Sequence, residues 1–345
     1  MAEDTLEAEA ERQRAAGNPG AALTLYLRAW AGPDDEVAER ILDLVEEWGD
    51  FDAALELTSA AAEAGDAGAY EVLADLLLRL DRPEDALAAL ERAARGGRDV
   101  TLWTAAVLAD EIGDRTRAEE FYRQALAEKN PRALNDYGVF LSMDDERLDE
   151  AAELLGRAIG EGDTKAAGNL GSLLADQGEY EEALPWLHRA LDAGHRFVLV
   201  VLGEAENATG AMEAAGGHLR EALAEELPGA HFAYALHLVD GGAEQEAVPH
   251  YEAAIDRDGE VNAYLNLALL HEDLQQWEQA DRRYQEAIGH QDGDAYLHYA
   301  QFLVEQGRTG RIGELLAEAV RLDVDPEDIE ELRALVDQEG PAPVS

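Results

Sequence analysis

The sequence predicts an all-α fold, an α-α superhelix of about ten helical hairpins followed by a C-terminal capping helix. Three observations predict it. A small side chain returns every 32 or 33 residues, a second alanine follows each one after seven residues, and the composition favours helix over strand.

The composition supports helices and excludes several kinds of site. Hydrophobic residues make up 47% of the 345 residues but aromatic ones only 6%, so a core would consist mainly of Ala and Leu, which favour helix. The absence of cysteine excludes disulfides, thiolate metal ligands and a cysteine nucleophile. No change in composition divides the chain, so one continuous array of helices is expected.

Two alanine series define the repeat. The first consists of Ala22, Ala54, Ala86, Ala118, Ala151, Ala183, Ala215, Ala247 and Ala280, with Ile312 in the tenth place. The second lies two helical turns later, at Ala29, Ala61, Ala93, Ala125, Ala158, Ala190, Ala222, Ala254, Ala287 and Ala319. Small residues two turns apart on one helix face allow a neighbouring helix to approach closely, so both series are expected to point inward.

Each repeat is predicted to contain two helices joined by a short turn. In the clearest repeat, residues 167–176 form the first helix, 177–180 the turn and 181–191 the second helix. Gly178 in this turn suits a helix end that needs positive φ. Four glycines inside second helices each cost up to about 1 kcal/mol relative to Ala and are expected to cause fraying: Gly216, Gly217, Gly310 and Gly313.

These residues resemble the tetratricopeptide repeat. One repeat carries Leu170-Gly171, Gly178, Tyr180, Ala183, Leu187 and Ala190, and another carries Tyr264, Leu267-Ala268, Trp277, Ala280, Tyr284 and Ala287. The spacing is slightly below the 34 residues of that family, and the stretch from Glu161 to Gly171 also resembles the related Sel1-like repeat. The resemblance implies a helical solenoid whose first helices line a concave groove for a peptide or a partner helix.

The repeat also predicts the domain boundaries. We predict a tandem tetratricopeptide-like solenoid over residues 1–324, a capping helix over 325–339 and a disordered tail over 340–345. The sequence shows no signal core and no apolar stretch of the roughly 18 residues that span a bilayer. We therefore expect a cytoplasmic protein without a membrane span.

No catalytic or metal-binding constellation is recognisable in the sequence. The nine histidines are scattered and form no His-Glu-x-x-His motif, and there is no phosphate-binding loop. His231 and His237, six residues apart, fall on different helix faces. We expect no catalytic residues, no metal and no cofactor, and hence a protein that is not an enzyme.

The charge restricts the kinds of partner. Lys plus Arg is 27 and Asp plus Glu is 75, giving a net charge of −48. Nucleic acid and anionic membranes are disfavoured as partners, because no segment offers a dense cationic track. The acidity itself has three possible explanations: attraction of a basic protein, genome composition, or adaptation to a salty cytoplasm.

Candidate binding residues lie on first helices of the central repeats, at positions that the resemblance assigns to the groove. They are Arg132, Asn135, Lys165, Asn169, Ser172, Phe197, Glu204 and Asn207. Some members of the family anchor a carboxylate with Lys, Arg and Asn at such places. The chain has only two lysines, Lys129 and Lys165, and both lie in or beside this stretch.

The predicted function is therefore that of a scaffold or adaptor that holds a protein or peptide in the groove. The partner would either be basic or present a carboxylate. The alternatives are a ligand- or peptide-responsive regulator and an accessory subunit of an enzyme complex.

Overall fold

The computed structural model describes residues 3–29, 36–97 and 101–339. Over these residues the chain consists of helices joined by short turns, with no strand. The tail predicted at 340–345 lies outside the described residues. The predicted all-α array of helical hairpins is confirmed.

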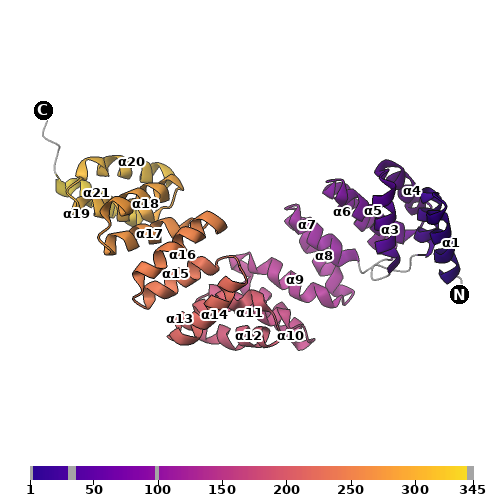
Figure 1. Ribbon diagram of the computed structural model, residues 1–345, viewed down its shortest axis with the longest axis horizontal. Helices are drawn as coiled ribbons and strands as arrows, with labels where there is room; N and C mark the ends of the chain where they lie inside the picture. Colours follow the sequence, from indigo (N-terminus) through magenta and orange to yellow (C-terminus); the bar gives the residue numbers. More distant parts are fainter. Residues whose placement is uncertain (1–2, 30–35, 98–100, 340–345) are drawn as a thin grey trace. The chain divides into compact units, whose positions relative to one another are not determined.

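The helices form two compact units, residues 1–169 and 170–345, with the division inside α11 (Figure 1). The helices up to this division are α1 (Glu3–Ala15), α2 (Pro19–Ala29), α3 (Glu36–Trp48), α4 (Phe51–Glu63), α5 (Ala67–Arg79), α6 (Pro83–Arg95), α7 (Thr101–Glu111), α8 (Arg115–Ala127), α9 (Pro131–Ser142), η1 (Asp145–Arg147), α10 (Leu148–Gly160) and α11 (Lys165–Asp176). Odd-numbered helices are the first helices of hairpins, and even-numbered ones are the second.

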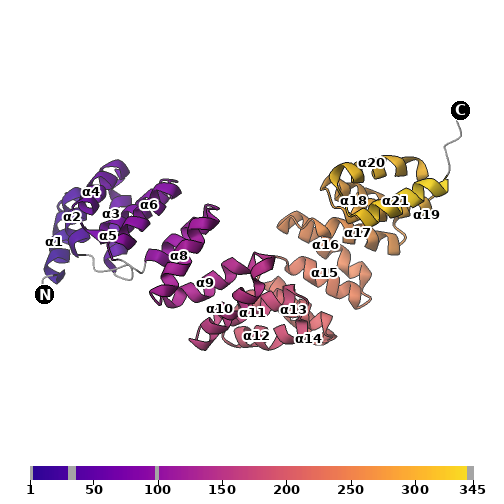
Figure 2. The ribbon, with the colours of Figure 1, turned by 180° about the vertical axis from the view of Figure 1, so that it is seen from behind.

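The second unit continues the alternation. Its helices are α12 (Tyr180–Asp192), η2 (Arg196–Val198), α13 (Leu199–Ala208), α14 (Met212–Ala224), α15 (Ala230–Asp240), α16 (Glu244–Ala253), η3 (Ala254–Asp258), α17 (Asn262–Asp273), α18 (Trp277–Gly289), α19 (Asp294–Glu305), η4 (Thr309–Arg311), α20 (Ile312–Leu322) and α21 (Pro326–Glu339). α21 packs against α19 and α20 through Ile329 and Leu332, as a capping helix does (Figure 2).

Both alanine series lie in the core, with one exception. Every member of the first series is buried, including Ile312, and so is every member of the second except Ala61. In α4 the buried residues are Ala54, Thr58 and Ala62, each four residues after the last. This stripe moves the second contact from Ala61 to the next residue, so the prediction is wrong at that position.

Glycines mark where the two helices of a hairpin approach most closely. A β-carbon added at Gly138, Gly171 or Gly203 would lie 2.8, 2.7 or 2.5 Å from the Cγ atom of a leucine in the second helix. The leucines are Leu155, Leu187 and Leu219. Since real β-carbons do not approach so closely, these three hairpins need glycine at the crossing.

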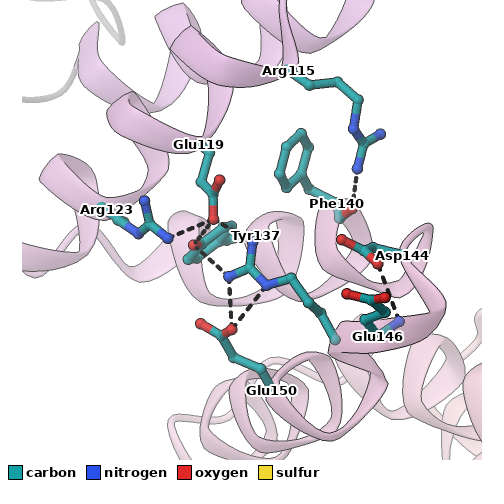
Figure 3. A network of polar contacts seen from close by, with 9 residues as sticks. Arg115, Glu119, Arg123, Tyr137, Phe140, Asp144, Glu146 and Glu150 are labelled. Carbon is teal, nitrogen blue, oxygen red and sulfur yellow. Dashed lines mark hydrogen bonds and ion pairs between the residues drawn. The ribbon is translucent and has the colours of Figure 1, made fainter.

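An aromatic and ionic cluster joins consecutive hairpins in the first unit (Figure 3). Tyr122 stacks on Tyr137 with ring centres 5.3 Å apart, and Phe140 lies 5.4 Å from Tyr122. The Tyr137 hydroxyl donates to Glu119, 3.0 Å away, and Glu119 also pairs with Arg147. Such aromatic pairs contribute about 0.5–1.5 kcal/mol beyond the area they bury.

The second unit contains the same cluster 162 residues later in the chain. Tyr284 stacks on Tyr299 at 5.4 Å, and Phe302 lies 5.3 Å from Tyr284. Asp281 takes the place of Glu119, accepting from the Tyr299 hydroxyl at 2.8 Å and from Arg308 at 2.9 Å. The same contacts therefore fix the stacking of hairpins in both units.

Two of the four second-helix glycines have a different setting from the one expected. Gly310 lies in the 3-10 turn η4, before α20 rather than inside it, because the turn after α19 is tightened. A β-carbon at Gly216 would lie 2.6 Å from Nε2 of His237, so α14 needs glycine there to let α15 approach. Fraying at these glycines remains a prediction.

Candidate binding faces on the first helices

In the first unit, the candidate face is built around Arg132. This exposed residue is the second in α9, and its backbone N–H donates to the Asn130 side chain at 3.0 Å. Its guanidinium carbon lies 5.2 Å from the centre of the Trp103 ring on α7, within cation–π range. No ion pair to Arg132 is formed by any carboxylate in the part of the chain that the structure describes.

Three hydrogen bonds link α7, α9 and α11 into what we call the polar ladder: Trp103, Asp136, Asn135 and Asn169. Trp103 Nε1 donates to Asp136 Oδ2 at 2.6 Å, and Asn135 Nδ2 donates to Asp136 Oδ1 at 2.8 Å. Asn169 Nδ2 donates to Asn135 Oδ1, also at 2.8 Å. Bonds to an ionised acceptor such as Asp136 are the strong ones, so the ladder holds the three first helices in register.

The polar ladder divides the predicted residues by role. Asn135 is 3% exposed and both ends of its amide are bonded, so it positions its neighbours and does not face a partner. Arg132 and Lys165 are exposed, while Asn169 is half-buried. Lys165 begins α11, and the positive ends of two helix dipoles therefore lie beside these two cations.

In the second unit, three first helices carry matching stripes of partly buried residues. The stripes are Val200, Glu204 and Asn207 on α13, Phe232, Leu236 and Val239 on α15, and Leu265, Leu269 and Glu272 on α17. Each follows the i, i+4, i+7 spacing of a single helix face. We call the six hydrophobic members the apolar face.

Contacts between these helices place the stripes side by side. A β-carbon at Gly229, just before α15, would lie 3.8 Å from Val200, near the start of α13. At the other end of the same helices, Asn207 Oδ1 lies 2.8 Å from His237 Nδ1. α15 and α17 share one hydrophobic cluster that includes Leu238 and Leu267, so all three stripes belong to one surface.

Carboxylates border this surface. Burial, and then the charge of Asp176, raise the pKa of Glu204, and burial raises the pKa of Asp176. Burial also raises the pKa of Glu272, although its carboxylate accepts a hydrogen bond from Tyr284 at 2.7 Å. We call Asp176, Glu204, Asp240 and Glu272 the carboxylate rim.

The eight predicted residues are divided equally between the units. Arg132, Asn135, Lys165 and Asn169 belong to the first unit, and Ser172, Phe197, Glu204 and Asn207 to the second. Phe197 is 42% exposed but lies in η2, one turn before α13. The sequence interpretation did not assign a role to Asp136 as a hydrogen-bond acceptor or recognise the apolar residues of α15 and α17.

The histidines are less scattered than the sequence suggested, since all nine fall in the second unit. His231 and His250 approach within 3.1 Å through their Nδ1 atoms, and the buried Glu206 lies 2.8 Å from Nδ1 of His218. Across residues 3–29, 36–97 and 101–339, no group of three or more His, Asp or Glu side chains is arranged to hold a metal. None of the helices in these ranges is long and apolar enough to cross a membrane.

Comparison with known families identifies the repeats. Models described as "Tetratricopeptide repeat" match residues 47–100 and 141–196, and a second such model matches residues 263–296. No curated protein sequence matches the chain.

Solved structures agree on the fold. The chain is similar to c5321, a protective antigen of uropathogenic Escherichia coli with an SLR fold, at 19% identity and a TM-score of 0.61, covering 99% of this chain and 80% of that one. A human IFIT1 dimer with PPP-AAAA matches at 15% identity and a TM-score of 0.55, covering 93% and 85%. A tetratricopeptide repeat protein from Parabacteroides merdae matches at 18% identity and a TM-score of 0.54, covering 69% and 98%. At these identities the similarity concerns the fold alone.

Proposed function

Because the chain carries tetratricopeptide repeats with Sel1-like features, we propose that it is a scaffold or adaptor that holds segments of partner proteins on its first-helix faces. The observation that carries the proposal is the polar ladder beside two exposed cations. In a chain with 75 acidic residues, Arg132 and Lys165 form no ion pair with any carboxylate among the described residues.

The ladder supports binding because it keeps the anchor rigid. Trp103, Asp136 and Asn169 are already hydrogen-bonded, so the face loses little conformational freedom when a partner arrives. Arg132, Lys165 and the half-buried Asn169 amide offer donors suited to a carboxylate, from an acidic side chain or a chain terminus. We propose that this face of the first unit anchors such a group.

The test is a selection from a random peptide library with free C-terminal carboxylates, using the full chain as bait. The variant Arg132→Glu/Lys165→Glu should weaken the selected carboxylate-presenting peptides at least tenfold, since hydrogen bonds to charged groups contribute about 1.5–3 kcal/mol each. The control Lys129→Glu/Arg157→Glu makes the same charge change at exposed positions off the first helices. It should leave binding within about twofold.

Two outcomes would count against the proposal. If the library yields no binder above background, the adaptor function itself fails. If the control variant weakens binding as much as the anchor variant, the effect is one of net charge, and the anchor is wrong.

A further inference from the structure

Charge is distributed unevenly between the two helices of each hairpin in the second unit. The first helices α13, α15, α17 and α19 contain seven Asp or Glu residues and no Lys or Arg. The arginines of this unit lie on second helices, in turns and on α21. In the first unit, by contrast, α1, α3, α5 and α9 each carry Arg and α11 begins with Lys165.

The stability of the helices does not explain this arrangement. α11, α15, α17 and α19 each end on a carboxylate, at Asp176, Asp240, Asp273 and Glu305. A negative charge at a helix C-terminus opposes the helix dipole and costs about 0.3–1 kcal/mol. Residues that break a local rule without a compensating contact commonly serve function.

The carboxylate rim lacks internal cations. Glu204 and Asp176 raise the effective charge density of one spot, and neither forms an ion pair within the described ranges. A cation from outside would therefore gain the attraction of both without displacing an existing partner.

We propose that the apolar face with its carboxylate rim binds a basic, amphipathic segment of another protein. Hydrophobic side chains of the segment pack on Val200, Leu236 and Leu265, and its Lys or Arg side chains pair with Glu204, Asp240 and Glu272. This inference rests on the proposed adaptor function and specifies the partner of a different face from the Arg132 anchor. The all-acidic rim disfavours the other occupants, a nucleic acid or a second copy of this chain with its charge of −48.

The experiment pans a random 16-residue peptide library against the full chain at 0.15 M salt, where the Debye length is about 8 Å and distant charges are screened. The rim variant is Glu204→Gln/Asp240→Asn/Glu272→Gln. The control variant, Glu182→Gln/Glu244→Gln/Glu278→Gln, removes the same charge from exposed positions on second helices. The dissociation constant of the most enriched peptide is then measured by fluorescence polarisation.

We expect peptides enriched in both Lys or Arg and large hydrophobic residues. The rim variant should weaken the most enriched one at least tenfold and the control variant less than about twofold, with Leu236→Ser also weakening it. Binders without basic residues, or equal losses in the two variants, overturn the inference and leave the adaptor function standing. If no peptide binds at all, the adaptor function fails as well.

Discussion

The contact between Gly203 and Leu219 allows a direct test of how the hairpins pack. In Gly203→Ala, the new β-carbon would lie 2.5 Å from Cγ and 2.7 Å from Cδ2 of Leu219, which is fully buried. Overpacking of this kind costs about 1–3 kcal/mol, while replacing a helical glycine returns up to about 1 kcal/mol. We expect a net loss of about 1 kcal/mol or more in the local stability of α13 and α14.

The matched control is Gly217→Ala in α14. A β-carbon there meets nothing within 4 Å, so only the gain in helix propensity of about 1 kcal/mol remains. The two variants should therefore differ by about 2 kcal/mol, or roughly thirtyfold in an equilibrium constant.

Hydrogen exchange followed by mass spectrometry is the suitable assay, because a chain of repeats need not unfold in one two-state step. Backbone amides of α13 and α14 should exchange faster in Gly203→Ala and more slowly in Gly217→Ala than in the unmodified chain. If Gly203→Ala slows exchange as Gly217→Ala does, the helices do not cross closely at this glycine.

Three further predictions concern single side chains. Glu204→Gln should raise the melting temperature at pH 7, because the raised pKa means that ionised Glu204 destabilises the folded state, and the gain should vanish at low pH; an unchanged melting temperature contradicts this. Burial lowers the pKa of His271 from its ordinary 6.5, so the unfolded chain takes up that proton first; stability should fall as pH drops below about 6.5, less steeply in His271→Gln by thermal melting. Trp103→Phe removes the bond to Asp136 and should cost about 1–2 kcal/mol, with faster exchange at the start of α9; a loss confined to α7 would show that the ladder does not join the helices.

Much of the fold follows from the spacing of small residues. The interval between Ala183 and Ala215 predicted the length of a hairpin, and the expected helices at 167–176 and 181–191 lie within the observed α11 and α12. Ala61 shows where this reasoning ends. Composition cannot decide which of three adjacent alanines in α4 faces the core, because the choice depends on how the helix rotates against its neighbours.

The candidate site was less predictable because its contacts join residues about 33 positions apart. The sequence contains Asn135 and Asn169, but only the packing of α9 against α11 shows that one amide bonds the other and that Asn135 is buried. Gly216 is similar, since its need for glycine comes from His237 on the next hairpin. The absence of Lys and Arg from α13, α15, α17 and α19 is different: it becomes visible in the sequence as soon as first helices are separated from second helices.

The most direct measurement is site-specific photo-crosslinking on the full chain. A benzophenone amino acid placed at Leu236 of α15 should crosslink the most enriched basic peptide, and one placed at the exposed Gln245 of α16 should not. An equal or stronger crosslink from Gln245 would contradict the assignment of binding to the first helices.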